Sequence, residues 1–152
     1  MPAAAPSPWL RRFFHLAVAF SALTGFAQMP IFKRYYIADI PGLGWLAQYH
    51  LTYTLHYFSA ILVAGLGAYL LTAYRVSPRS MRRTAPAGYV DAGLLLLIVA
   101  SGGLLVIRNL PGYRFTPRSV VALDFTHLGL VLIFLLWIAA ALPLRRRRRS
   151  AA

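Results

Sequence analysis

Few side chains in this sequence could bind a metal ion or carry out acid–base chemistry. There are four histidines, at His15, His50, His56 and His127, and three acidic residues, all of them aspartate. The absence of cysteine excludes disulfides, thiolate catalysis, cysteine-bound zinc and an iron–sulfur cluster held by this chain. Any metal must therefore be held by histidine, carboxylate or methionine, or within a cofactor.

The composition predicts that these residues lie in a membrane protein. Of the 152 residues, 59% are hydrophobic and 12% are charged, whereas a soluble domain carries about 25% charged residues. The formal net charge of +13 could suggest nucleic-acid binding. The basic residues, however, stand in short clusters between long uncharged stretches, which is typical of topology signals and argues against a nucleic-acid partner.

Four long, largely apolar segments approach or exceed the roughly 20 residues that a helix needs to cross a bilayer. The predicted spans run from about Phe13 to Met29, Trp45 to Tyr74, Ala87 to Ile107 and Pro117 to Leu142. Thr116 followed by Pro117 is typical of a helix start. Glycines that would allow close helix packing are Gly65, Gly67, Gly102 and Gly103. We therefore predict an all-α, integral membrane four-helix bundle that forms one domain over residues 1–152, with a basic tail at 143–152.

The distribution of Lys and Arg predicts the orientation. Eleven of the 16 basic residues lie before the first span, between the second and third, and after the fourth, and the other five lie toward the opposite side of the membrane. By the positive-inside rule both termini are cytoplasmic, in a multi-pass protein of the inner (cytoplasmic) membrane. Arg145 to Arg149 would then anchor to anionic lipid. The alternative is a cleaved signal peptide ending near Gly25 to Ala27, which would leave three spans.

His56 and His127 are predicted at similar depths in parallel helices. His56 lies eleven residues after Trp45, roughly 16 Å into its span, and His127 lies ten residues after Pro117, roughly 15 Å into its own. Two imidazoles so placed could ligate one haem iron from opposite faces. Small residues near them would let a porphyrin approach: Ser59, Ala60 and Gly129. The alternative is that each histidine only hydrogen-bonds a neighbouring span, and zinc or copper is disfavoured because only two good ligands converge.

His50 precedes His56 by six residues, so the two rings cannot face the same iron on one helix. With Tyr49 and Tyr53 it suits an aromatic belt at the membrane interface. A contact with a haem propionate or a quinol is the alternative.

Several short motifs together carry a resemblance to a known family. They are Arg12 and His15 followed by Leu23-Thr24-Gly25, then Leu55-His56-Tyr57-Phe58, then Ser101-Gly102 to Arg108, Pro111 to Pro117, Val120-Val121 and Asp124 to His127. They resemble the membrane cytochrome b (gamma) subunits of formate dehydrogenases and nickel–iron hydrogenases over most of the chain. The resemblance implies that His56 and His127 bind an outer haem b and that His15 binds an inner one.

One position departs from the family. Its fourth helix supplies a second histidine where this chain has Ala141, so the inner haem lacks one ligand and we expect one haem per chain. His15, with Asp91 at a similar level of the third span, would then be a remnant of the inner haem site or would hydrogen-bond a quinone head group. An interfacial histidine that touches lipid head groups is the alternative for His15.

The resulting hypothesis is a haem b membrane anchor that transfers electrons between an external redox subunit and the quinone pool. The partner would carry the iron–sulfur or other catalytic centres, because this chain is not catalytic alone. Basic residues on the external side could pair with propionates or dock the partner: Lys33, Arg34, Arg108, Arg114 and Arg118. The main alternative is a redox-inactive anchor or assembly subunit of a larger complex. A small transporter has less support, because Asp91 and Asp124 lie toward span ends.

Overall fold

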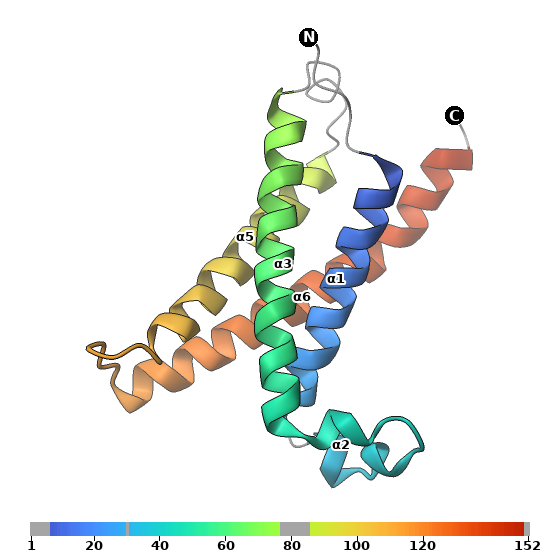
Figure 1. Ribbon diagram of the computed structural model, residues 1–152. Coiled ribbons are helices and arrows are strands. Elements are labelled where there is room, and N and C mark those ends of the chain that lie inside the picture. Colours follow the sequence, from blue (N-terminus) through green and yellow to red (C-terminus); the bar gives the residue numbers. More distant parts are fainter. Residues whose placement is uncertain (1–6, 30, 77–85, 151–152) are drawn as a thin grey trace. The chain divides into compact units, whose positions relative to one another are not determined.

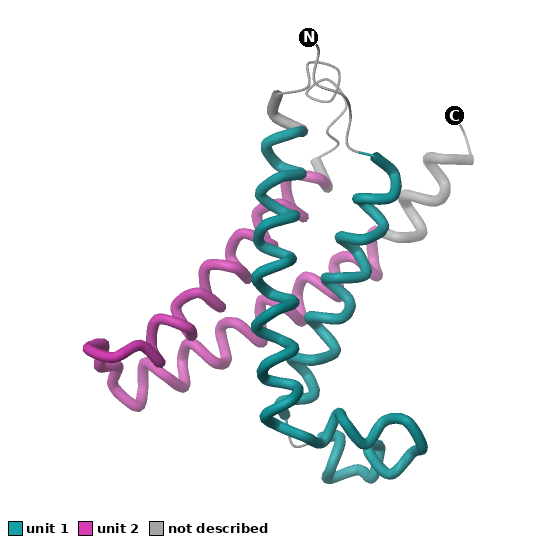
Figure 2. The backbone as a smooth tube through the Cα atoms, viewed as in Figure 1, with its two compact units in different colours: residues 1–82 teal, residues 83–152 magenta. Residues whose placement is uncertain are grey.

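The computed structural model describes residues 7–29, 31–76 and 86–150, in which every regular element is a helix (Figure 1). The chain divides into two compact units, Met1–Arg82 and Arg83–Ala152 (Figure 2). Each unit contains one helical hairpin. The all-α class predicted from the sequence is therefore confirmed.

The first unit pairs α1 (Pro8–Ala27) with α3 (Tyr49–Val76), which run antiparallel (Figure 1). The start of α1 follows from local chemistry, because the Ser7 side chain accepts a hydrogen bond from the Leu10 N–H at 3.3 Å and Pro8 occupies the first turn. Thr24 of α1 and Thr52 of α3 are fully buried. Both hydroxyls donate to carbonyls of their own helices, so neither is left unsatisfied.

A folded link connects these two helices. It contains α2 (Ile31–Arg34) and the short 3-10 helices η1 (Ile37–Asp39) and η2 (Gly44–Ala47). The Trp45 ring stacks on Phe20 of α1 at 6.5 Å, and Leu46 is buried. Because Trp45 and Leu46 pack back on the hairpin, α3 begins at Tyr49, four residues after the predicted start of this span.

The second unit pairs α5 (Pro86–Ile107) with α6 (Pro117–Ser150). The predicted start of the last helix is confirmed, since Thr116 Oγ1 accepts from the Ser119 N–H at 3.2 Å and Pro117 is the first helical residue. The turn before it includes Gly112 at φ +93°, a conformation that favours glycine. The helix continues beyond the predicted span, through the Arg145–Arg149 run, to Ser150.

Three helical segments among the described residues are long and apolar enough to cross a membrane. They are Tyr49–Ala73, Gly88–Ile107 and Pro117–Ala141, with mean hydropathies of 1.5, 2.4 and 2.2. They correspond to the second, third and fourth predicted spans. The helix of the first predicted span, α1, has 20 residues and carries Arg11 and Arg12 in its second turn; it is not among the three.

Candidate functional site

His56 of α3 is held against α1 by its Nδ1 atom. This nitrogen lies 2.9 Å from the Ser21 carbonyl oxygen and 3.4 Å from Thr24 Oγ1. A carbonyl can only accept, so the Nδ1 atom must carry the proton and donate it. The neutral His56 ring therefore has its lone pair on Nε2.

Gly25 lets the His56 ring come this close. A Cβ atom at residue 25 would lie 3.0 Å from Cε1 of His56 and 3.3 Å from Nδ1, but 3.8 Å from Nε2. The ring thus rests on the α1 backbone by its Cε1–Nδ1 edge.

His127 of α6 is held against α5 in a closely similar way. Its Nδ1 lies 2.9 Å from Ser101 Oγ, and the Ser101 hydroxyl donates its single proton to the Ile98 carbonyl at 3.0 Å. With its proton so used, the serine oxygen is free to accept from the histidine, and the tautomer that makes this bond has the proton on Nδ1 and the lone pair on Nε2. A Cβ atom at Gly102 would lie 3.1 Å from Cε1, 3.6 Å from Nδ1 and 3.9 Å from Nε2 of His127.

Each hairpin therefore builds one histidine seat, a term used here for the acceptor, hydroxyl and glycine against which the ring rests. Seat 1 consists of Ser21, Thr24 and Gly25, and seat 2 consists of Ile98, Ser101 and Gly102. Imidazoles that bind a metal through one nitrogen usually donate the other N–H to a carbonyl, carboxylate or water. Both seats supply this kind of second contact, which favours the tautomer required for ligation through Nε2.

The positions of His56 and His127, each measured from the start of its own helix, differ more than the sequence predicts. His56 lies seven residues after the start of α3, a rise of about 10 Å, whereas His127 lies ten residues after the start of α6, a rise of about 15 Å. The difference arises because Trp45 and Leu46 belong to the link rather than to the helix.

Charged and aromatic groups flank the two histidines. One turn before His127 on the same helix, both carboxylate oxygens of Asp124 accept from Arg108 at 3.1 Å. Beside His56, the rings of Tyr49, Tyr53 and Tyr57 follow one another along α3 with centroids 5.8 and 4.7 Å apart. The Tyr53 hydroxyl donates to the Tyr57 hydroxyl at 3.0 Å. This tyrosine ladder lies on the external half of the helix in the predicted orientation.

The remaining candidates from the sequence lie elsewhere. His15 is exposed on α1, with an edge-on contact to Phe14 at 6.0 Å, and His50 is exposed in the first turn of α3. Asp91 of α5 accepts a 2.8 Å hydrogen bond from Trp137 Nε1 of α6. Trp137 was not identified from the sequence, and the pairing of His15 with Asp91 joins residues of different units and stays a prediction.

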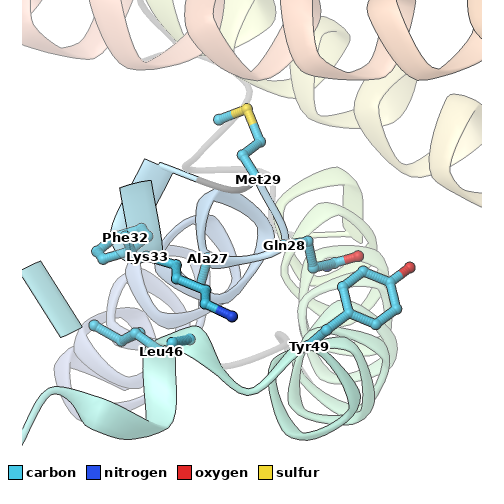
Figure 3. A pocket seen from close by; sticks show the side chains of 8 residues that line it. Ala27, Gln28, Met29, Phe32, Lys33, Leu46 and Tyr49 are labelled. Carbon is cyan, nitrogen blue, oxygen red and sulfur yellow. The ribbon is translucent and has the colours of Figure 1, made fainter. Parts of the chain in front are cut away.

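A pocket lies at the end of the first hairpin, where α1, α2, η2 and the start of α3 meet (Figure 3). Its empty volume is about 480 Å³, part of it open to the surroundings. The walls are largely apolar, and the polar side chains are Gln28, Lys33 and Tyr49. Figure 3 shows the Lys33 ammonium directed toward the side formed by Gln28 and Tyr49. His50 does not line this pocket.

Sequence reasoning found both histidines but not the residues that hold them. Gly102 was predicted only to allow close helix packing, and Thr24-Gly25 and Ser101-Gly102 entered only as parts of family motifs. A usable signal exists, because each histidine helix is preceded by a helix with a hydroxyl residue directly before glycine. Of the small residues predicted to make room for a porphyrin, Ser59 is buried, and a Cβ at Gly129 would meet nothing within 4 Å.

Comparison with known proteins gives no match to a family model, a curated protein or a solved structure. Within residues 7–29, 31–76 and 86–150, no three His, Asp, Glu or Cys side chains gather closely enough to hold a metal ion between them.

Proposed function

We propose that this chain is a haem b-binding membrane anchor that passes electrons between an external redox subunit and the quinone pool. The observation that carries the proposal is the hydrogen-bond contact that each histidine makes through Nδ1. Each ring donates through Nδ1 within its own hairpin, at 2.9 Å in both cases, and so keeps its lone pair on Nε2. An iron porphyrin accepts two such neutral imidazoles as axial ligands.

Each histidine, taken within its own hairpin, has the donor chemistry that this group requires. His56 and His127 would hold it, and the iron would supply one-electron chemistry between its ferric and ferrous states. The seats orient the two rings, and the apolar helices Tyr49–Ala73 and Pro117–Ala141 would exclude water around them. The open space at Gly129, within one turn of His127, supplies room that a side chain would fill.

The proposal also covers the membrane topology, the remaining candidate residues and the partner subunit. Helix α1 would also cross the membrane, as the first of four spans, and both termini would face the cytoplasm, because most basic residues lie on that side. His15 and Asp91 would bind a quinone head group, and His50 would contact a propionate or a quinol. The partner subunit, which holds the iron–sulfur or other catalytic centres, docks on the external side.

A redox-inactive anchor or assembly subunit is the second candidate. The observation that favours it is that both Nδ1 atoms already find acceptors inside their own hairpins. Histidines that only join two helices would make the same bonds, each worth roughly 1 kcal/mol.

The haem content of the purified protein distinguishes the electron-transfer anchor from the redox-inactive one. We expect the protein, purified from membranes of a haem-supplied host, to give about one haem b per chain in a pyridine haemochrome assay and a low-spin absorption spectrum. A chain that is folded, by circular dichroism, but contains no haem would refute the electron-transfer proposal and support the structural anchor. A ratio near two would show that an inner haem binds despite Ala141.

A further inference from the structure

We infer that the two histidine seats are positioning devices of unequal chemistry, in which Ser101 sets the electron donation of His127. Both seats fix the proton on Nδ1, but seat 1 receives it on a backbone carbonyl and seat 2 on a side-chain hydroxyl. The positioning of the two histidine rings does not require haem to be bound. The effect on electron donation rests on the proposed function, because it requires the haem to bind.

The correspondence between the seats covers three positions of the sequence. In each first helix the glycine lies under the histidine ring, the hydroxyl residue stands one position before it, and the accepting carbonyl belongs to the residue four positions before it. The distances from a Cβ at glycine to Cε1 agree within 0.1 Å, at 3.0 and 3.1 Å. Two unrelated packing contacts would not be expected to repeat both the spacing and the edge of the ring that is held.

The seats differ in which group accepts the hydrogen bond from Nδ1. In seat 1 the His56 Nδ1–H goes directly to the Ser21 carbonyl, and Thr24 Oγ1 is a more distant neighbour at 3.4 Å. In seat 2 the Ser101 hydroxyl stands between the ring and the carbonyl of Ile98, accepting from one and donating to the other. Such a chain of hydrogen bonds polarises its members, so the serine oxygen becomes a better acceptor for the imidazole.

An acceptor on Nδ1 increases the basicity of the ligating nitrogen. A more basic ligand stabilises ferric relative to ferrous iron and lowers the midpoint potential. At seat 1 this acceptor is backbone and survives any side-chain change. At seat 2 it is the Ser101 side chain, so one substitution removes it. Serine hydroxyls in membrane helices also bond to carbonyls of their own helix without any second partner, and a test must separate that purely structural role.

The first experiment reads the tautomer without haem. The full chain, labelled with ¹⁵N in histidine and placed in lipid nanodiscs, gives ring-nitrogen shifts that report which nitrogen is protonated, with assignments from His56→Gln and His127→Gln. We expect Nδ1–H for both rings in the unsubstituted protein. Ser101→Ala should bring the Nε2–H form into the His127 signal and leave His56 unchanged, and Ser101→Thr, which copies Thr24 of seat 1, should restore Nδ1–H. A His127 tautomer indifferent to Ser101→Ala, or Nε2–H in the unsubstituted protein, would overturn the positioning role.

The second experiment measures the midpoint potential of the bound haem. Ser101→Ala should raise it, by about 59 mV if the ferric form is destabilised tenfold, and Ser101→Thr should return it. Thr52→Val is the matched control and should leave the potential unchanged, because the Thr52 hydroxyl is also buried but donates to the Gln48 and Tyr49 carbonyls and belongs to neither seat. Equal shifts in Ser101→Ala and Thr52→Val, or none in either, would overturn the tuning role. A chain that never binds haem would instead refute the proposed function and leave the tautomer measurement to decide on the seats.

Discussion

Replacing Gly102 by alanine tests the seat of His127 most sharply through stability. The added methyl carbon would lie 3.1 Å from Cε1 of His127, whereas carbon atoms pack best at about 3.5–4.0 Å. The ring or the helix must therefore move by roughly half an ångström. Overpacking of this kind costs about 1–3 kcal/mol, partly offset by the gain of about 1 kcal/mol when alanine replaces glycine in a helix.

The neighbouring glycine provides the matched control. A Cβ at Gly103 meets nothing within 4 Å, so Gly103→Ala should show only the helix-propensity gain. We therefore expect Gly102→Ala to be less stable than Gly103→Ala by about 1–3 kcal/mol. Stability would be measured as the free energy of unfolding in SDS titrations of detergent-solubilised protein, followed by far-UV circular dichroism.

A double-mutant cycle identifies the clashing partner. In a His127→Ala background the ring is gone, and the difference between Gly102→Ala and Gly103→Ala should fall to within about 0.5 kcal/mol. Equal stability of the two glycine variants with His127 present would contradict a clash at Gly102. A difference that survives removal of the ring would also contradict it, because the methyl group would then clash with something else.

Three further predictions concern the second hairpin and the topology. Trp137→Phe removes the donor that reaches Asp91 at 2.8 Å and should reduce the free energy of unfolding by about 1–2 kcal/mol, while Asp91→Asn keeps an acceptor oxygen and should cost less; equal stability of Trp137→Phe and the unsubstituted protein would contradict this. Arg108→Gln should cost at most about 1 kcal/mol, because the ion pair with Asp124 is partly exposed; the cost should shrink in high salt, and a larger, salt-independent loss would oppose it. Reporter fusions at the two termini should both be active in the cytoplasm, and an external reporter at either end would contradict the proposed topology.

Helix positions proved predictable where local chemistry decides them. Thr116 and Pro117 mark the start of α6, and the apolar stretch before Arg108 marks the end of α5, because a cap, a proline and a change in polarity are all local signals. The start of α3 was predicted four residues early. Trp45 and Leu46 are as apolar as the span that follows, and only their packing on the hairpin, which includes the Trp45–Phe20 stack, removes them from it.

The candidate site was predictable in part for the same reason. His56 and His127 stand out because an ionisable residue in an apolar helix is expensive. Their seats depend on which turn of the preceding helix faces each ring, and that is a non-local property of helix pairing. All four residues Gly25, Gly102, Gly65 and Gly103 are glycines within helices, so the sequence does not separate them. A Cβ atom at Gly65 or Gly103 would meet nothing within 4 Å, whereas one at Gly25 or Gly102 would meet a histidine ring. Only the folded hairpins distinguish them.

The central proposal is that His56 and His127 would both bind one haem b, and the low-spin spectrum of single variants tests it most directly. His56→Ala and His127→Ala would be compared with Gly65→Ala, which should meet no neighbour, at equal protein concentration and after a check of folding by circular dichroism. Loss of the low-spin haem b spectrum in each histidine variant, with one haem per chain retained in Gly65→Ala, is the predicted result. A full low-spin spectrum in either histidine variant would contradict the account.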